Sequence, residues 1–178
     1  MISDAEILLV EDDPNDVALT LRAFRSENIQ SRIEVVRDGE EALDYLLCRG
    51  AFRHRSPDQG PNLILLDLKL PKIGGFQVLE ELRKNPSCAW IPVVVLTSSG
   101  EHRDIAESYR LGVNSYVQKP VDIGEFRKTI HALVSYWLGV NRLPLSPKKR
   151  VSPLIAPAPV GSSPVGPSPV EPAANFDE

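Results

Sequence analysis

The residues most able to do chemistry in this sequence each follow a short apolar run. They are Glu11, Asp12, Asp67, Thr97, Ser98 and Lys119. Because the carboxyl ends of parallel strands lie at one edge of an α/β sheet, side chains that follow such strands are expected to meet there. Carboxylates that lie close together repel one another, and burial makes their ionisation costlier still. The set therefore favours a hard divalent cation, Mg²⁺ or Mn²⁺, as counter-charge.

A carboxylate held beside such a cation can attack a phosphoryl group and form an acyl phosphate, provided that the charge on the phosphoryl oxygens is neutralised. We predict Asp67 as this nucleophile, with Glu11 and Asp12 holding the metal directly or through water. An ammonium and hydroxyl groups would contact the phosphoryl oxygens that the metal leaves free. The predicted phosphate contacts are Thr97, Ser98 and Lys119.

The elements that must position these residues follow from the order of apolar patterns. Short apolar runs alternate with amphipathic helical patterns, as in βαβ units around a parallel sheet. The third run, LILL, is apolar throughout, which is typical of a central strand buried on both faces. The sequence thus predicts an α/β fold with a doubly wound, five-stranded parallel sheet. The predicted strands span residues 6–10, 33–36, 63–66, 93–96 and 115–118.

Helices are predicted after the strands from the spacing of apolar residues. Asp13 before Pro14 is a typical helix N-cap followed by a first-turn proline. The other expectations are a turn at 38–39, a polar loop at 49–61, a short fourth helix at 105–111 and a fifth helix with an apolar stripe from Phe126 to Trp137.

The composition changes near residue 145, after which proline recurs every few residues and large apolar side chains become rare. Such a segment cannot bury enough surface to offset the entropy lost on ordering it. We therefore expect one folded domain over residues 1–145 and a disordered, proline-rich tail over residues 146–178.

Charge and cysteine usage restrict the compartment and the classes of partner. The formal net charge of −4 gives no general attraction to nucleic acid or to an anionic membrane. No apolar stretch approaches the roughly 20 residues needed to span a bilayer, and the N-terminus lacks the order of a signal peptide. Cys48 and Cys88 lack metal-ligand spacing. We expect a cytoplasmic protein with free thiols that binds neither nucleic acid nor membrane.

The segments LLVEDD, LILLDLKLP, VVVLTSS and SYVQKPV resemble, in this order, the receiver domains of two-component response regulators across about residues 5–140. The stretches LLDLKLPKIGGFQVLEELR and SYWLGVNRLPL are similar to the stand-alone regulators paired with cyanobacterial and bacterial phytochromes. The resemblance implies a flavodoxin-like receiver fold and phosphorylation by a sensor histidine kinase, here of the phytochrome type.

The resemblance also implies a role for individual residues. The sequence departs from the family pattern at Gly74, where Asp or Ser more often precedes the glycine, so we expect that loop to be less firmly tied without loss of phosphorylation. The implied roles are phosphoacceptor for Asp67, acidic pocket for Glu11 and Asp12, backbone-carbonyl metal ligand for Lys69, switch hydroxyl for Thr97, aromatic switch for Tyr116, and phosphate contact for Lys119 before a cis Lys119–Pro120 bond.

Two other functions stay open on the sequence. A phosphorylation-independent interaction scaffold would use the same fold, and an Asp-dependent phosphohydrolase would use the same carboxylate and metal. Such a hydrolase needs a second acid two residues after its nucleophile to activate water, and that position is Lys69. We therefore expect a signalling protein and not an enzyme.

We recognise no output domain after Val140, so we expect signalling through contact with a downstream protein target that the sequence does not identify. The resemblance implies that the fourth helix, the fifth strand and the fifth helix form the readout face, and that this face mediates a homodimer.

Overall fold

The sheet has the predicted strands and the predicted direction. The computed structural model describes residues 6–26, 31–56 and 60–142. All neighbouring strands pair in parallel, in the order β2-β1-β3-β4-β5. The order reverses between β1 and β3, and ligands of open α/β sheets bind beyond the strand ends at such a point. The strands are β1 (Glu6–Val10), β2 (Arg32–Val36), β3 (Leu63–Leu66), β4 (Val93–Thr97) and β5 (Ser115–Gln118).

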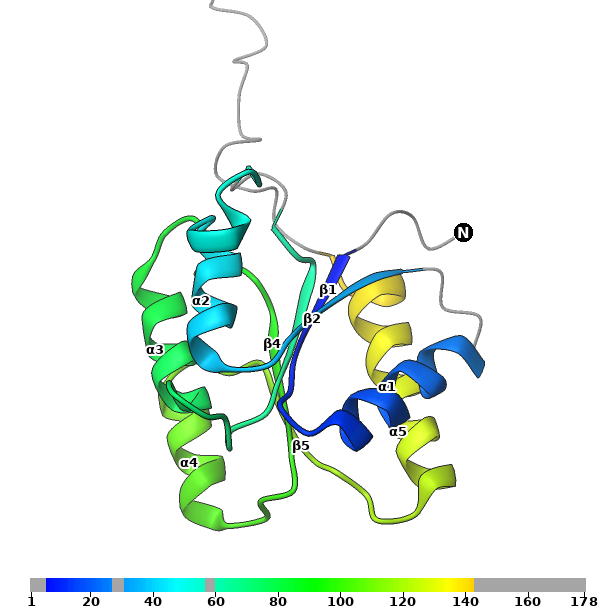
Figure 1. Ribbon diagram of the computed structural model, residues 1–178. Coiled ribbons are helices and arrows are strands. Elements are labelled where there is room, and N and C mark those ends of the chain that lie inside the picture. Colours follow the sequence, from blue (N-terminus) through cyan, green and yellow to red (C-terminus); the bar gives the residue numbers. More distant parts are fainter. Residues whose placement is uncertain (1–5, 27–30, 57–59, 143–178) are drawn as a thin grey trace, which may run out of the picture.

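Helices cover both faces of the sheet, as Figure 1 shows. On one face, α1 (Pro14–Ser26) lies in contact with α5 (Ile123–Val134). The other face carries α2 (Gly39–Leu46), α3 (Gly75–Lys84) and α4 (His102–Arg110). The predicted doubly wound, flavodoxin-like fold is therefore confirmed.

The central strand β3 is buried on both faces, as the LILL run predicts. Ile64 and Leu66 pack into the apolar cluster beneath α2 and α3, whereas Leu63 and Leu65 pack into the cluster beneath α1 and α5. Burial of each of these side chains contributes roughly 1.5–3 kcal/mol relative to exposure. The residue that follows, Asp67, is therefore fixed at the end of a firmly packed strand.

Two helices begin earlier than the sequence pattern predicts. Residues 38–39 do not form an isolated turn, because the Asp38 carboxylate accepts a hydrogen bond from the Glu41 amide at 2.8 Å and caps α2. Helix α4 begins at His102, before the predicted start at Ile105. The residues of its first turn are polar, so apolar periodicity cannot reveal them.

The polar loop predicted over 49–61 contains a short 3₁₀ helix, η1 (Gly50–Phe52). The Phe52 ring packs edge-on against the Tyr45 ring at 5.0 Å between centroids. The Arg55 guanidinium lies 3.5 Å from the centroid of the same Tyr45 ring. These contacts hold the segment against α2, and no local sequence pattern indicates them.

The apolar stripe predicted from Phe126 to Trp137 runs past the end of α5 into a π-helical turn, η3 (Ser135–Val140). Trp137 packs against the cluster beneath α1 and α5, whereas Tyr136 beside it is 51% exposed. Trp137 therefore belongs with the core.

The predicted tail, residues 146–178, and the predicted domain boundary at residue 145 lie outside the described residues. Within the described ranges, no helix is both long enough and apolar enough to cross a membrane.

Arg83 of α3 joins three chain segments on the side of the sheet away from the strand ends that carry the site. Its guanidinium donates hydrogen bonds to the carbonyls of Gly112, Ala89 and Ile91, and to the side chain of Asn114.

Replacing Arg83 with methionine should lower the free energy of unfolding by about 2 kcal/mol, because several acceptors lose their donor at once. Urea unfolding measures this loss. Arg110→Met, which removes only an exposed pair with Glu107, should leave the midpoint unchanged, and equal losses in both variants would contradict the prediction.

Candidate functional site

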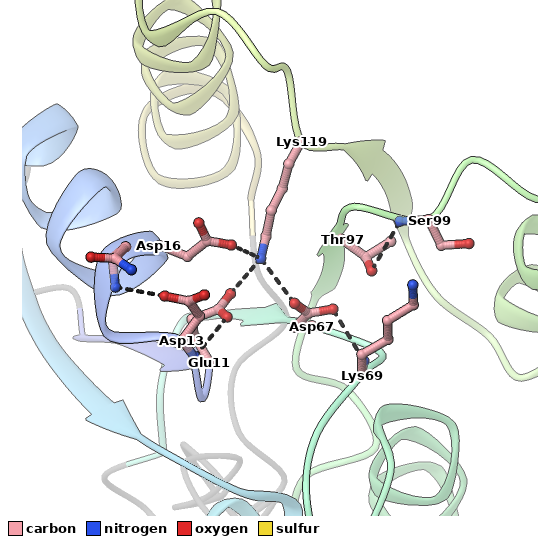
Figure 2. A network of polar contacts seen from close by, with 9 residues as sticks. Glu11, Asp13, Asp16, Asp67, Lys69, Thr97, Ser99 and Lys119 are labelled. Atoms are coloured by element: carbon pink, nitrogen blue, oxygen red, sulfur yellow. Dashed lines mark hydrogen bonds and ion pairs between the residues drawn. The ribbon is translucent and has the colours of Figure 1, made fainter.

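Side chains that follow β1, β3 and β5 meet around one ammonium group (Figure 2). Lys119 Nζ lies 2.6 Å from Glu11 Oε2 and 2.9 Å from Asp67 Oδ2. A further carboxylate, Asp16 in the first turn of α1, has its Oδ2 at 2.6 Å from the same nitrogen. The structure therefore brings together Glu11, Asp67 and Lys119, as the strand-end argument predicts, and adds Asp16.

The Lys119 side chain is only 9% exposed, so its charge depends on these partners. Burial alone would lower the pKa of Lys119, but hydrogen bonds to Asp16, Asp67 and Glu11 outweigh it and raise that pKa above the ordinary 10.5. The lysine therefore stays protonated and supplies the positive charge of the site.

Asp67 is held at both carboxylate oxygens. Its Oδ2 accepts from Lys119 Nζ, and its Oδ1 accepts from the Lys69 amide at 3.1 Å. Gly75 at the start of α3 packs directly behind it, because a Cβ there would lie 2.4 Å from the Asp67 carbonyl oxygen and 2.7 Å from Leu68 Cα. Only glycine allows α3 to begin this close to the strand end.

Glu11 is 2% exposed and shares in the same ion pair. Burial raises the pKa of Glu11 to about 7, against the opposing effects of the Lys119 hydrogen bond and charge. Its Oε1 also accepts a hydrogen bond from the Asp13 amide at 3.3 Å. We therefore expect the charge of Glu11 to depend on pH near neutrality.

The carboxylates that lie together are not quite those predicted. One oxygen from each of Glu11, Asp16 and Asp67 lies within 4.8 Å of the others, whereas Asp12 is exposed and outside this group. Clustered carboxylate oxygens are the donors that hard divalent cations prefer, so the set fits such an ion. Strand-end reasoning missed Asp16 because it lies inside a helix, although Pro14 at the first helical position could have placed it in the first turn.

Thr97 and Tyr116, the predicted switch residues, are connected through Ser99. Thr97 is fully buried, and its Oγ1 accepts from the Ser99 amide at 3.4 Å. The Tyr116 hydroxyl donates to the Ser99 carbonyl at 3.0 Å. The Ser99 hydroxyl donates to Asp104 Oδ2 at 2.5 Å, which ties the end of β4 to α4. Ser98, which lies between Thr97 and Ser99 in the sequence, is exposed.

The predicted cis Lys119–Pro120 bond is wrong, because the described residues contain no cis peptide bond. The trans form is intrinsically favoured by about 0.5–1 kcal/mol. With a trans bond the Lys119 amide donates to the Thr97 carbonyl at 2.7 Å and Nζ already reaches the carboxylates. The position of the ammonium therefore does not require the cis form.

The loop before α3 is held in place by other contacts, although residue 74 is a glycine where the family more often has Asp or Ser. Lys72 Nζ lies 2.7 Å from Asp38 Oδ2 and 3.2 Å from Glu40 Oε2 at the start of α2. The Gly74 amide donates to Gln77 Oε1 at 3.2 Å. An ion pair to α2 and a helix-start hydrogen bond hold this loop, although residue 74 has no side chain to do so.

The raised pKa of Glu11 predicts a pH-dependent cation affinity. Because an acid binds a cation better once ionised, Mg²⁺ affinity should rise by up to about tenfold per pH unit below pH 7 and level off above it. Calorimetric titrations between about pH 5.5 and 8 measure this slope. Glu11→Gln should remove this pH dependence of Mg²⁺ affinity, and the control Asp13→Asn should keep it. If the pH dependence stayed the same in Glu11→Gln, the proton would belong to another group.

Comparison with known proteins places this arrangement in a family. The model of the response regulator receiver domain matches residues 7–131. Response regulator Rcp1 from Synechocystis is 41% identical over 138 residues, which cover 78% of this chain and 92% of that protein. The probable methanogenesis regulatory protein FilR2 from Methanothrix harundinacea is 42% identical over 139 residues, covering 78% and 86%.

Solved structures agree with this assignment. The Mn²⁺-bound form of Rcp1 is similar with a TM-score of 0.72 and 38% identity, covering 79% of this chain and 99% of that one. The phosphorylated cyanobacterial phytochrome response regulator RcpA is similar with a TM-score of 0.75 and 37% identity, covering 80% and 99%. With its parallel sheet and strand-end carboxylates, the chain belongs to the response regulator receiver domain family.

Proposed function

We propose that this response regulator accepts a phosphoryl group on Asp67 from a sensor histidine kinase. The proposal is based on the position of Asp67, which follows the buried strand β3. Its two carboxylate oxygens accept hydrogen bonds from the Lys119 ammonium and the Lys69 amide. A carboxylate fixed in this way is already oriented for attack. As an Asp67 oxygen bonds to phosphorus, the bond from phosphorus to the kinase histidine nitrogen breaks, and an acyl phosphate results.

The acidic pocket would hold Mg²⁺ or Mn²⁺ through Glu11, Asp12, Asp67 and the Lys69 backbone carbonyl. The clustered oxygens of Glu11 and Asp67 support these two ligands, and the Mn²⁺-bound form of the relative Rcp1 supports a divalent ion; Asp12 and the Lys69 carbonyl are carried over from the family resemblance. Such an ion, when bound, neutralises charge on the phosphoryl oxygens. The Lys69 amide bond to Asp67 keeps the Lys69 backbone beside the reacting carboxylate.

The remaining phosphoryl oxygens would be contacted by Thr97, Ser98 and Lys119. Thr97 and Tyr116 both contact Ser99, so a Thr97 hydroxyl drawn toward the phosphoryl group would alter the bonds at Ser99. Because Ser99 also binds Asp104, that change would reach α4. Thr97 and Tyr116 would thus act as a two-state element that reports phosphorylation to a downstream protein.

The phosphodonor would be a phytochrome-type histidine kinase. Support comes from the likeness to RcpA, a cyanobacterial phytochrome response regulator, and to Rcp1 over nearly the whole length of each. After transfer the acyl phosphate would persist as a signal, because Lys69 offers no carboxyl group to activate water.

Phosphoryl uptake from acetyl phosphate, with and without Mg²⁺, tests this function. We expect Mg²⁺-dependent labelling of the intact protein, and a higher Mg²⁺ requirement for Asp12→Ala, which lacks a proposed metal ligand. Catalytic turnover of the donor without labelled protein would indicate a phosphohydrolase. No uptake under any condition would indicate a phosphorylation-independent scaffold.

We also propose a homodimer through the face formed by α4, β5 and α5. Large apolar side chains are exposed on these elements: Tyr109 on α4 is 53% exposed, and Ile123 at the start of α5 is 61% exposed. Light scattering across micromolar concentrations should show a dimer that Ile123→Asp weakens. Val140→Asp, at an exposed apolar residue of η3, is the matched control. A monomer at every concentration, phosphorylated or not, would refute this interface.

A further inference from the structure

The Lys119 ammonium has no spare hydrogen-bond donor. A protonated lysine carries three N–H groups. In this structure they meet Glu11 and Asp16 at 2.6 Å and Asp67 at 2.9 Å (Figure 2). A phosphoryl group on Asp67 would bring new acceptor oxygens to the same place. Lys119 can bind them only by giving up bonds that it already makes, first the bond to Asp67, whose carboxylate loses its charge on acylation, and then a bond to one of the other two carboxylates.

Of the two carboxylates that keep their charge on phosphorylation, Asp16 is better suited than Glu11 to release the lysine. The Asp16 side chain is 36% exposed, whereas those of Glu11 and Asp67 are 3% and 8% exposed. A carboxylate released into water is rehydrated at once, but a buried carboxylate that loses its partner bears the full cost of desolvation. Asp16 can therefore release the lysine at a lower cost than Glu11, which would have to take up a proton or stay charged where it is buried.

Asp16 also has a fixed position from which to hold the lysine. It lies in the first turn of α1, where Asp13 caps the helix by accepting from the Asn15 amide at 2.7 Å. The Val17 amide donates to the Asp13 carbonyl at 3.0 Å, which closes the first turn around Asp16. The backbone that carries Asp16 is therefore fixed, and its bond to Lys119 holds the ammonium toward α1.

We propose that Asp16 is a positioning residue that holds Lys119 toward α1 before phosphorylation and competes with the phosphoryl group for its ammonium. This inference rests on the proposed phosphorylation of Asp67. Phosphorylation then exchanges the bond from Lys119 to Asp16 for a bond from Lys119 to a phosphoryl oxygen. By stabilising the unphosphorylated state, the bond from Asp16 to Lys119 makes the phosphorylated conformation less favourable.

Beryllofluoride, which binds carboxylates as a phosphoryl mimic, tests the exchange at equilibrium. We would titrate the full chain with beryllofluoride at saturating Mg²⁺ by calorimetry. Asp16→Asn should bind about fivefold more tightly than wild type, the size expected for one partly exposed charge-assisted bond. Asp13→Asn removes the same charge from the neighbouring cap, keeps an N-cap residue, and should change affinity less than about twofold. Asp16→Glu, which can still bind the ammonium, should return toward wild type.

Mg²⁺ titration without beryllofluoride separates this role from metal binding. If Asp16 acts on Lys119, Asp16→Asn and Asp13→Asn should differ little in Mg²⁺ affinity. A much larger loss in Asp16→Asn would make Asp16 a metal ligand and overturn the proposal. Equal beryllofluoride affinities in the two variants would overturn it as well, while leaving Asp67 as phosphoacceptor. If wild type itself failed to bind beryllofluoride with Mg²⁺, the proposed function would fail first.

Discussion

Asp67→Asn should abolish acyl-phosphate formation, because the amide nitrogen and oxygen that replace the carboxylate do not form a stable acyl phosphate. The side chain keeps its shape, and the carbonyl oxygen of asparagine can still accept from the Lys69 amide that now bonds Oδ1. We therefore expect loss of all detectable labelling from acetyl phosphate and an almost unchanged melting temperature.

Asp122→Asn is the matched control for this substitution. Asp122 caps α5 by accepting from the Glu125 amide at 2.9 Å, and asparagine caps helices as well as aspartate does. This variant should label like wild type. Wild-type labelling of Asp67→Asn would move the phosphoacceptor to another carboxylate.

Lys119→Met should destabilise the metal-free protein by about 3 kcal/mol near neutral pH, because it leaves buried carboxylates without their counter-charge. Glu11 and Asp67, whose side chains are 3% and 8% exposed, would then lose the ammonium that favours their ionised forms. The folded-state pKa of Lys119 lies above its ordinary value, so wild type keeps this stabilisation from neutral pH up to about pH 10.5 and loses it as pH rises further. Urea unfolding at pH 7 measures the loss.

Two conditions should restore stability to Lys119→Met. Millimolar Mg²⁺ replaces the missing positive charge, and acid pH protonates the carboxylates that are left without it. Lys128→Met, which removes an exposed ion pair with Glu125 on α5, should unfold at the wild-type midpoint. If Lys119→Met were as stable as wild type without Mg²⁺, the ion pairs of Lys119 would contribute nothing to folding.

The order of apolar runs was enough to predict the sheet. A run such as LILL can be buried on both faces only in a central strand, and the structure places β3 between β1 and β4. Polar helix starts were not predictable in the same way, because the first turn of α4 has no apolar residue to mark it. Boundaries marked by apolar spacing were therefore the more reliable ones.

The sequence was enough to predict the site residues that directly follow strands. Glu11, Asp67 and Lys119 lie together because parallel strands deliver their carboxyl ends to one edge, which is a property of the fold class. Asp16 escaped this reasoning because its place depends on how α1 leaves β1 and packs beside α5.

The sequence by itself determined the five strands, the helices that follow them, which strand is central and which groups end the strands, because alternation and apolar runs are local properties of the chain. Only the tertiary structure decided which carboxylates share the Lys119 ammonium, and that Ser99 connects Thr97 to Tyr116. The physical reason is that hydrogen bonds and ion pairs require distances between groups far apart in sequence to be right to within a few tenths of an ångström. Such distances are fixed only when helices and strands pack against one another.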